Sequence, residues 1–366
     1  MTVGFYSPLP PAHTGVADYS AALLSALRQI GPVEVGPERC DVPLYHLGNN
    51  ELHAAIYRRA LEHPGVVVLH DAVLHHFLLG QLDARAYVEE FTFNYGEWNR
   101  ATAEELWRAR AASGADHRYF QFPMLKRVAE RSRAVIVHNP AAARIVRRHA
   151  PGTEVVEIPF LFEEPALPGA DEVARYRGRI GLPRDGFVFG VFGYLRESKR
   201  LANVLEVFAR LRDKQPNTYL LVAGSFVSTD LERAVEPLVA APGVIRVPHL
   251  STRDFWLAAG AVDACINLRY PAAGETSAIA IQFMGIGKPV VVTDGEECAH
   301  FPEDALIRIA AGVEERDSLR YHMGLLTSLP EVARAIGERG ARHIREHHQI
   351  ERIARLYWDT LCAYSG

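Results

Sequence analysis

The sequence predicts an α/β protein with two domains, each a parallel sheet covered by helices on both faces. The chain has 366 residues, which is more than one ordinary domain needs and suits two. Its apolar runs are short and continuous, as expected for strands that are buried on both faces. Longer segments with helical spacing separate these runs, which is typical of the crossover connections between parallel strands.

The predicted strands fall into two groups along the chain. Those of the first half are Val3–Tyr6, Val66–Leu69 and Ala134–Val137. Those of the second half are Phe187–Phe192, residues 219–223, residues 264–268 and Val290–Thr293. Apolar stripes at helical spacing predict helices at residues 201–211 and 350–361.

A linker is expected between the two halves, at residues 159–184, which are rich in Pro, Gly, Glu and Arg. We therefore expect a first domain at residues 1–165, a second at residues 166–345 and a last helix at residues 346–366. Open α/β domains bind ligands where strand ends meet helix starts, so the cleft between the domains is the expected site.

Composition narrows the classes of function. The chain is 48% hydrophobic and 23% charged, as soluble globular proteins are, and its net charge of −4 gives no basis for nucleic-acid binding. No apolar run approaches the roughly 20 residues that span a bilayer, and the first residues do not resemble a signal peptide. The four cysteines show neither metal-binding spacing nor a disulfide framework, so we expect a cytoplasmic location.

A glycine turn followed by a lysine is the first candidate site. Gly193 ends a predicted strand, and Lys199 precedes an amphipathic helix. The helix dipole disfavours a cation at this position unless an anion lies between the lysine and the helix amides. Arg196 supplies a second positive group. The alternative is a solvated lysine, the state of most lysines.

The sequence Gly-Glu-Thr-Ser at positions 274–277 is the second candidate site. The carboxylate of Glu275 suits sugar hydroxyls, while free amides at a helix start suit a phosphate. Alternatively, Glu275 is a first-turn glutamate with Thr276 or Ser277 as the cap, or it pairs with Arg269. Gln282 is expected two turns along the same helix face, either at a ribose or as a polar cap.

The first half offers polar residues at a strand end. His70 and Asp71 follow Val66–Leu69, where doubly wound sheets place ligand groups, although a packed histidine and a capping aspartate would also fit. Asn49 belongs to a turn that tolerates left-handed backbone. His343, His347 and His348 are expected on a solvated helix face.

The second half resembles the donor domain of the retaining GT-B glycosyltransferases, the large group 1 family that uses nucleotide sugars. The resemblance is carried, in the family's order, by Gly193, Lys199 and residues 221–224, 263–267, 274–277 and 287–290. Tyr194 stands where the family commonly has an arginine, and Gln282 stands where it has a second glutamate. Glu275 is shifted by one position from the family's first glutamate.

The resemblance implies a GT-B fold, with two Rossmann-like domains facing across a cleft and the last helix packing back on the N-terminal, acceptor-binding domain. It implies catalytic roles for His70, Arg196, Lys199 and Glu275. The implied donor-binding residues are Gly15, Gly193, Tyr194, Gly274, Thr276, Ser277, Ala278 and Gln282. The implied acceptor-binding residues are His13, Asp71 and Asn49.

The implied activity is that of a retaining hexosyltransferase, which moves a sugar from a nucleotide-diphosphate sugar to an acceptor hydroxyl without a metal or other cofactor. The acceptor would be a saccharide, a glycolipid or a small molecule, as in polysaccharide biosynthesis. Three alternatives stay open: a nucleotide-sugar epimerase, a sugar phosphorylase, and a degenerate nucleotide-sugar-binding subunit. Peripheral contact with the inner face of a membrane and the oligomeric state also stay open.

Overall fold

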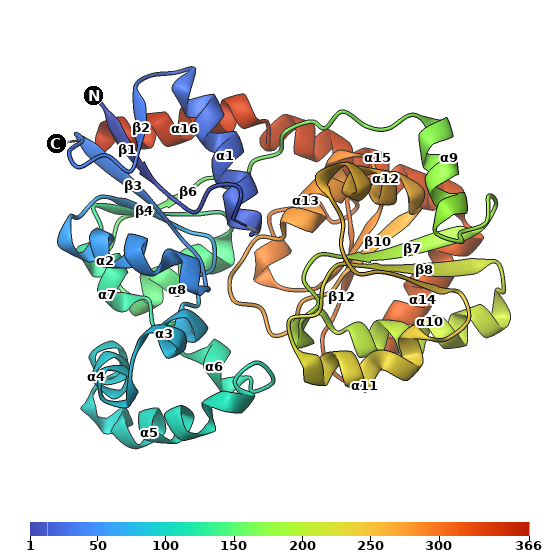
Figure 1. Cartoon of the computed structure of the whole chain (residues 1–366), viewed down its shortest axis with the longest axis horizontal. Coiled ribbons are helices and arrows are strands. Elements are labelled where there is room, and N and C mark those ends of the chain that lie inside the picture. The colour runs from blue at the N-terminus through green and yellow to red at the C-terminus, as the bar shows by residue number, and fades with distance from the viewer. Residues whose placement is uncertain (13, 366) are drawn as a thin grey trace.

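The structure, a computed structural model, describes residues 1–12 and 14–365 and contains two six-stranded sheets side by side (Figure 1). The strand order is β2-β1-β3-β4-β5-β6 in the first sheet and β12-β11-β10-β7-β8-β9 in the second. Neighbouring strands are parallel in both sheets. The predicted fold class is confirmed.

The strands of the first sheet are β1 (Val3–Tyr6), β2 (Val33–Val35), β3 (Val42–Leu47), β4 (Val66–Leu69), β5 (Ala134–Val137) and β6 (Val155–Glu157). The strands of the second are β7 (Phe187–Phe192), β8 (Thr218–Ala223), β9 (Val244–Val247), β10 (Ala264–Asn267), β11 (Val290–Thr293) and β12 (Ile307–Ile309). All the predicted strands are present, with small differences at their ends.

The helices up to the end of the first sheet are α1 (Gly15–Arg28), η1 (Glu51–His53), α2 (Ala54–Glu62), α3 (His75–Gln81), α4 (Ala84–Tyr95), η2 (Glu97–Asn99), α5 (Arg100–Ala109), η3 (Arg110–Ala112), α6 (Arg118–Gln121), α7 (Lys126–Arg131) and α8 (Pro140–His149). The later helices are α9 (Ala170–Arg179), η4 (Glu197–Lys199), α10 (Leu201–Lys214), α11 (Thr229–Val239), α12 (Thr252–Ala261), α13 (Ala278–Gly285), η5 (Glu296–Cys298), α14 (Glu315–Ser328), α15 (Pro330–His347) and α16 (Ile350–Ala363). Within residues 1–12 and 14–365, no helix combines the length and apolarity that crossing a bilayer requires.

Each sheet has its own apolar core on both faces. Helices α3 to α6 form a separate helical unit below the first sheet, and α16 runs beside α1 at the top of the same lobe (Figure 1). The hydroxyl groups of Tyr19 in α1 and Tyr357 in α16 lie 3.0 Å apart in this packing. The two ends of the described chain therefore lie on the same lobe.

The segment that joins the lobes differs from the expected linker, because it contains the ten-residue helix α9. The expectation of a solvated histidine face is confirmed for His347, which is exposed, and is wrong for His348, which is buried at the end of α15. Its ring nitrogen Nδ1 donates to the carbonyl of Phe160 (2.6 Å), and the backbone N–H of Phe162 donates to the carbonyl of His348 (2.6 Å). These hydrogen bonds join the segment between the lobes to the end of α15, from which the chain returns to the first lobe.

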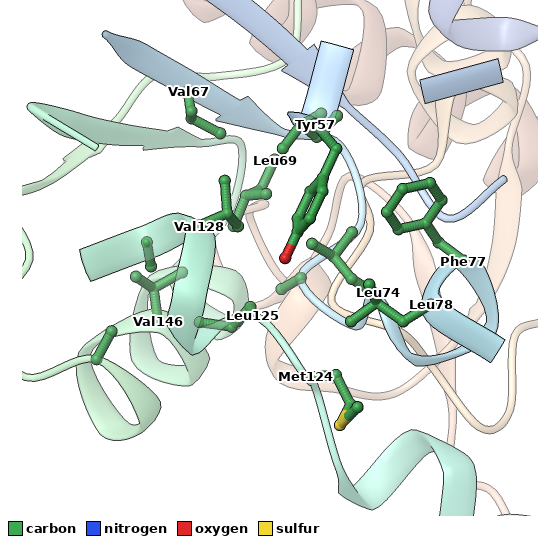
Figure 2. Packing of buried hydrophobic residues seen from close by; sticks show 14 of the residues in the cluster. Tyr57, Val67, Leu69, Leu74, Phe77, Leu78, Met124, Leu125, Val128 and Val146 are labelled. Atoms are coloured by element: carbon green, nitrogen blue, oxygen red, sulfur yellow. The ribbon is translucent and has the colours of Figure 1, made fainter. Parts of the chain in front are cut away.

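The packing below the carboxyl end of β4 positions the polar residues of the first lobe. Figure 2 shows Leu74, Phe77 and Leu78, from the start of α3, gathered around Tyr57 of α2. The ring centroids of Tyr57 and Phe77 lie 5.3 Å apart in an edge-on arrangement. This rigid apolar base supports the loop in which His70 and Asp71 lie.

Candidate active site

The turn after β7 folds Lys199 inward. Gly193 has a φ of +84°, which a glycine adopts without the strain of a side chain. A Cβ atom at this position would lie 3.2 Å from the Lys199 Nζ atom, so the glycine leaves room for the ammonium group. Lys199 is 7% exposed and donates to the carbonyl of Phe192. The alternative of a solvated lysine is therefore wrong.

The environment of Lys199 weakens its hold on its proton. Burial lowers the pKa of Lys199 to about 7, and the positive charge of Arg269 contributes further to the lowering. An ammonium group has three N–H donors, and the carbonyl of Phe192 accepts from one of them. An anion at this site would stabilise the charged form.

A buried carboxylate fixes the backbone that follows Lys199. Arg200 has a φ of +58°, a left-handed conformation that costs energy in a residue other than glycine. Its Nε atom donates to both carboxylate oxygens of Glu315 (3.0 and 3.2 Å), which also accepts from Asn203. The side chain of Glu315 is 1% exposed. This network directs the chain from η4 into α10.

Replacing Glu315 tests that support. Glu315→Ala leaves the guanidinium of Arg200 without its buried acceptor, so we expect a loss of about 3 kcal/mol in the free energy of unfolding. Urea unfolding followed by circular dichroism measures the loss. The exposed neighbour Glu314→Ala is the control, with an expected change below about 0.5 kcal/mol. Equal stabilities of the two variants would contradict the role given to the network.

The loop before α13 holds Glu275 in one orientation. The Arg269 Nη1 atom donates to Glu275 Oε1 (2.6 Å), and the backbone N–H of Ala273 donates to Oε2 (2.6 Å). The side chain of Glu275 is 14% exposed. Gly274 has a φ of +73°, and a Cβ atom there would lie 2.7 Å from the Cβ atom of Ala72 in the first lobe. The two lobes therefore approach closely at this loop.

The start of α13 corrects one expectation. Ser277 is the N-cap and accepts from the backbone N–H of Ala280 (3.3 Å), as expected for a cap, and Asn267 Nδ2 donates to its hydroxyl (2.8 Å). Glu275 precedes the helix, which begins at Ala278. The alternative of a first-turn glutamate and the expected helix face shared with Gln282 are therefore wrong, although Gln282 lies in α13. The alternative that Glu275 pairs with Arg269 is confirmed.

Asp71 and Asn49 form the facing wall in the first lobe. The backbone N–H of Asn49 donates to Asp71 Oδ2 (2.8 Å), and Asn49 Oδ1 accepts from the backbone N–H of Phe77 (2.7 Å). Burial raises the pKa of Asp71 to about 6, and the negative charge of Glu275 raises it further while Arg196 opposes the increase. Asp71 thus lies within electrostatic reach of the second lobe.

His70 lies deeper in the same wall. Its Nε2 atom is 3.0 Å from Nδ1 of His46, and its ring packs against Tyr19 and His138. Burial lowers the pKa of His70 well below its ordinary value, and the charges of His138 and His46 act in the same direction. His70 is therefore neutral near pH 7 and largely packed.

The remaining expected site residues are Arg196, Tyr194, Gly15 and His13. Arg196 and Tyr194 are exposed in the turn between β7 and η4. Gly15 begins α1, and a Cβ atom there would meet no atom within 4 Å, so the backbone at this helix start is open to approach. His13 lies outside the described residues.

Asn139 was missed by the sequence analysis although it joins the two lobes. Its Nδ2 atom donates to the carbonyl of Gly274 (3.0 Å) and to the hydroxyl of Thr276 (2.9 Å), while its Oδ1 atom caps α8. The backbone N–H of Val73 also donates to the carbonyl of Ala273 (3.0 Å). The Asn-Pro pair after β5 signals a helix cap, but nothing in the sequence signals the contact with the other lobe.

The space beside Glu275 is small in this closed arrangement. A cavity of about 50 Å³ is lined by Arg269, Glu275, Ser277 and Thr293, among others. Sites for ligands of nucleotide-sugar size measure roughly 300 to 1,000 Å³. The cavity is therefore smaller than a site for a ligand of that size, and all its lining residues belong to the second lobe. A larger hollow, of about 480 Å³, lies along α11 and is lined by none of the expected site residues.

Solved structures share this architecture over the whole chain. Sucrose-phosphate synthase from Thermosynechococcus elongatus has a TM-score of 0.71 and 16% identity, with 99% of each chain covered. HepE from Anabaena, solved with UDP and glucose, has a TM-score of 0.68 and 14% identity over 99% of this chain and 100% of its own.

WaaG, a glycosyltransferase involved in lipopolysaccharide biosynthesis, has a TM-score of 0.64 and 16% identity, covering 98% of this chain and 99% of its own. No protein-family model matches the chain, and no curated protein matches its sequence. The solved structures confirm, at the level of fold, the resemblance predicted from the sequence. The chain has the GT-B fold that these solved structures share.

Proposed function

We propose that this protein is a retaining hexosyltransferase that moves a sugar from a nucleotide-diphosphate sugar to an acceptor hydroxyl without a metal ion. One observation carries the proposal: the buried ammonium group of Lys199 and the fixed carboxylate of Glu275 lie within electrostatic reach of each other. They occupy the cleft where strand ends meet helix starts, the usual ligand position in open α/β sheets. The fold shared with glycosyltransferases supports it further.

The second lobe binds the donor in this proposal. Lys199 and Arg196 neutralise the charge that develops on the leaving diphosphate, which is an efficient form of catalysis in a site shielded from water. The amides at the start of α13, at residues 276–278, face a phosphate. Glu275 accepts hydrogen bonds from the sugar hydroxyls, and Gln282 contacts the ribose. Gly15, Gly193 and Gly274 allow the donor to approach the backbone.

The first lobe contributes the acceptor side. Asp71, Asn49 and His13 bind the acceptor, and His70 contacts the sugar from the wall opposite Glu275. The leaving phosphate takes the proton of the acceptor hydroxyl, so no side chain is needed as a nucleophile. Closure of the lobes through Asn139 excludes water and limits hydrolysis of the donor.

The test is a transfer assay that begins with UDP-glucose, because HepE is described in complex with this donor. Saccharide, glycolipid and small-molecule acceptors are tried with and without EDTA, and the anomeric configuration of the product is read by NMR. We expect release of the nucleoside diphosphate, a retained configuration and no effect of EDTA. An altered sugar formed without any acceptor would indicate an epimerase, and release of a sugar phosphate would indicate a phosphorylase.

The pKa of Lys199 predicts a pH dependence of donor binding. Because burial lowers this pKa to about 7, the free protein loses the ammonium charge as the pH rises above that value. We expect the affinity for the nucleoside diphosphate to fall by up to about tenfold per pH unit above the pKa. Titration calorimetry from pH 7 upward measures the fall. Lys199→Arg, whose charge persists, should remove this dependence, and a flat profile in the unmodified protein would contradict the assignment.

A further inference from the structure

Arg269 has hydrogen-bonding capacity that its protein contacts do not use. It follows β10, and its backbone N–H donates to the hydroxyl of Thr293 at the end of β11 (2.9 Å). Its Nη1 atom binds Glu275, but its Nε atom is buried and has no acceptor among the described residues. A buried N–H group without an acceptor costs free energy, which an acceptor on a ligand would recover. Arg269 also lines the small cavity beside Glu275, and its side chain is 28% exposed.

The charges of Arg269 and Arg196 act most strongly on different neighbouring groups. Burial is the main cause of the low pKa of Lys199, and among the neighbouring charges Arg269 contributes more to it than Arg196 does. Arg196 acts more strongly than Arg269 on Asp71 in the first lobe, and it also lowers the pKa of His76. Arg269 therefore acts more strongly than Arg196 on Lys199, whereas Arg196 acts more strongly than Arg269 on the first lobe.

Building on the function proposed above, we infer that Arg269 is a further cation, beside Lys199 and Arg196, that binds the donor diphosphate. Nη1 stays on Glu275 Oε1, and the remaining N–H groups of the guanidinium bind phosphate oxygens. A planar guanidinium is suited to two acceptors at once, because its donors are held in a fixed fork. One side chain thereby links the leaving diphosphate to the carboxylate that orients the sugar.

A double-mutant cycle separates this role from a merely structural one. Arg269→Gln is measured in the unmodified protein and in Glu275→Gln, with UDP and inorganic pyrophosphate as probes in titration calorimetry. We expect Arg269→Gln to weaken both probes by about 10- to 100-fold in both backgrounds. Arg269→Lys should recover part of the affinity, and Arg210→Gln, at an exposed arginine of α10, is the control with no change.

An effect of Arg269→Gln that disappears in the Glu275→Gln background would overturn the inference, because the arginine would then serve only to hold the carboxylate. Unchanged affinity in Arg269→Gln would overturn it as well. Thermal unfolding shows whether each variant is folded. If Arg269→Gln does not fold, Arg269→Lys is the deciding variant. Its affinity for the two probes should lie between those of the unmodified protein and of Lys199→Ala.

The pyrophosphate probe separates this inference from the proposed function. Pyrophosphate binding that depends on Arg269, in a protein that transfers no sugar, would support the inference and contradict the transferase proposal. Sugar transfer by a protein whose affinity for UDP does not depend on Arg269 would support the transferase proposal and contradict the inference. A protein that binds neither UDP nor pyrophosphate would contradict both.

Discussion

Lys199→Ala is expected to lower donor affinity and turnover together. The substitution removes the only lysine buried under the Gly193 turn within the described structure, and with it the charge-assisted hydrogen bond to the diphosphate that we propose. Such a bond contributes about 1.5 to 3 kcal/mol, which corresponds to a loss of roughly 10- to 100-fold in affinity. Because charge grows on the diphosphate as the sugar leaves, we expect a further loss in kcat of about 100-fold.

Calorimetry with the nucleoside diphosphate and steady-state kinetics with its sugar conjugate measure the two losses for Lys199→Ala. Lys214→Ala is a matched control, because this lysine is exposed at the far end of α10, the helix that follows Lys199. The control should retain both affinity and turnover. Unchanged kinetics in Lys199→Ala would remove this residue from the site.

Glu275→Gln is expected to damage sugar transfer much more than nucleotide binding. The glutamine keeps the size of the side chain but loses the charge that Arg269 and the amide of Ala273 hold in place. A neutral amide is a weaker acceptor for sugar hydroxyls, so we expect kcat to fall by about 100-fold or more. The affinity for the bare diphosphate should stay within about threefold, because the phosphate contacts remain.

The comparison of the sugar conjugate with the bare nucleotide decides the role of Glu275. Glu303→Gln, at an exposed glutamate of the second lobe, is the control and should change neither measurement. Equal losses of nucleotide binding and of transfer in Glu275→Gln would exclude a role in sugar contact. They would leave the carboxylate as a structural partner of Arg269.

The strands that the sequence predicted are those with continuous apolar runs, and all of them lie inside the sheets. The four strands at the sheet edges, β2, β6, β9 and β12, were not predicted. Edge strands are covered less completely and are short here, so they carry weaker apolar patterns. The interior strand β3 was also missed, although it is buried throughout, because Pro43 and His46 interrupt its apolar run.

Features of the candidate site could be predicted where a single segment of the sequence determines them. The inward position of Lys199 follows from the local Gly193 turn, and the cap at Ser277 follows from its own helix. Contacts between lobes were not predictable, because they depend on how two distant segments meet. The hydrogen bonds from Asn139 to Gly274 and from His348 to Phe160 are contacts between distant segments.

The most direct test of the central claim is a thermal-shift screen of the unmodified protein and Lys199→Ala. The ligands are UDP, GDP, ADP and dTDP with their common sugar conjugates, each with and without a divalent metal ion. We predict that one diphosphate series raises the Tm of the unmodified protein without metal and leaves that of Lys199→Ala unchanged. No shift with any of these ligands, or an equal shift in both proteins, would contradict the assignment of a nucleotide-sugar site at Lys199 and Glu275.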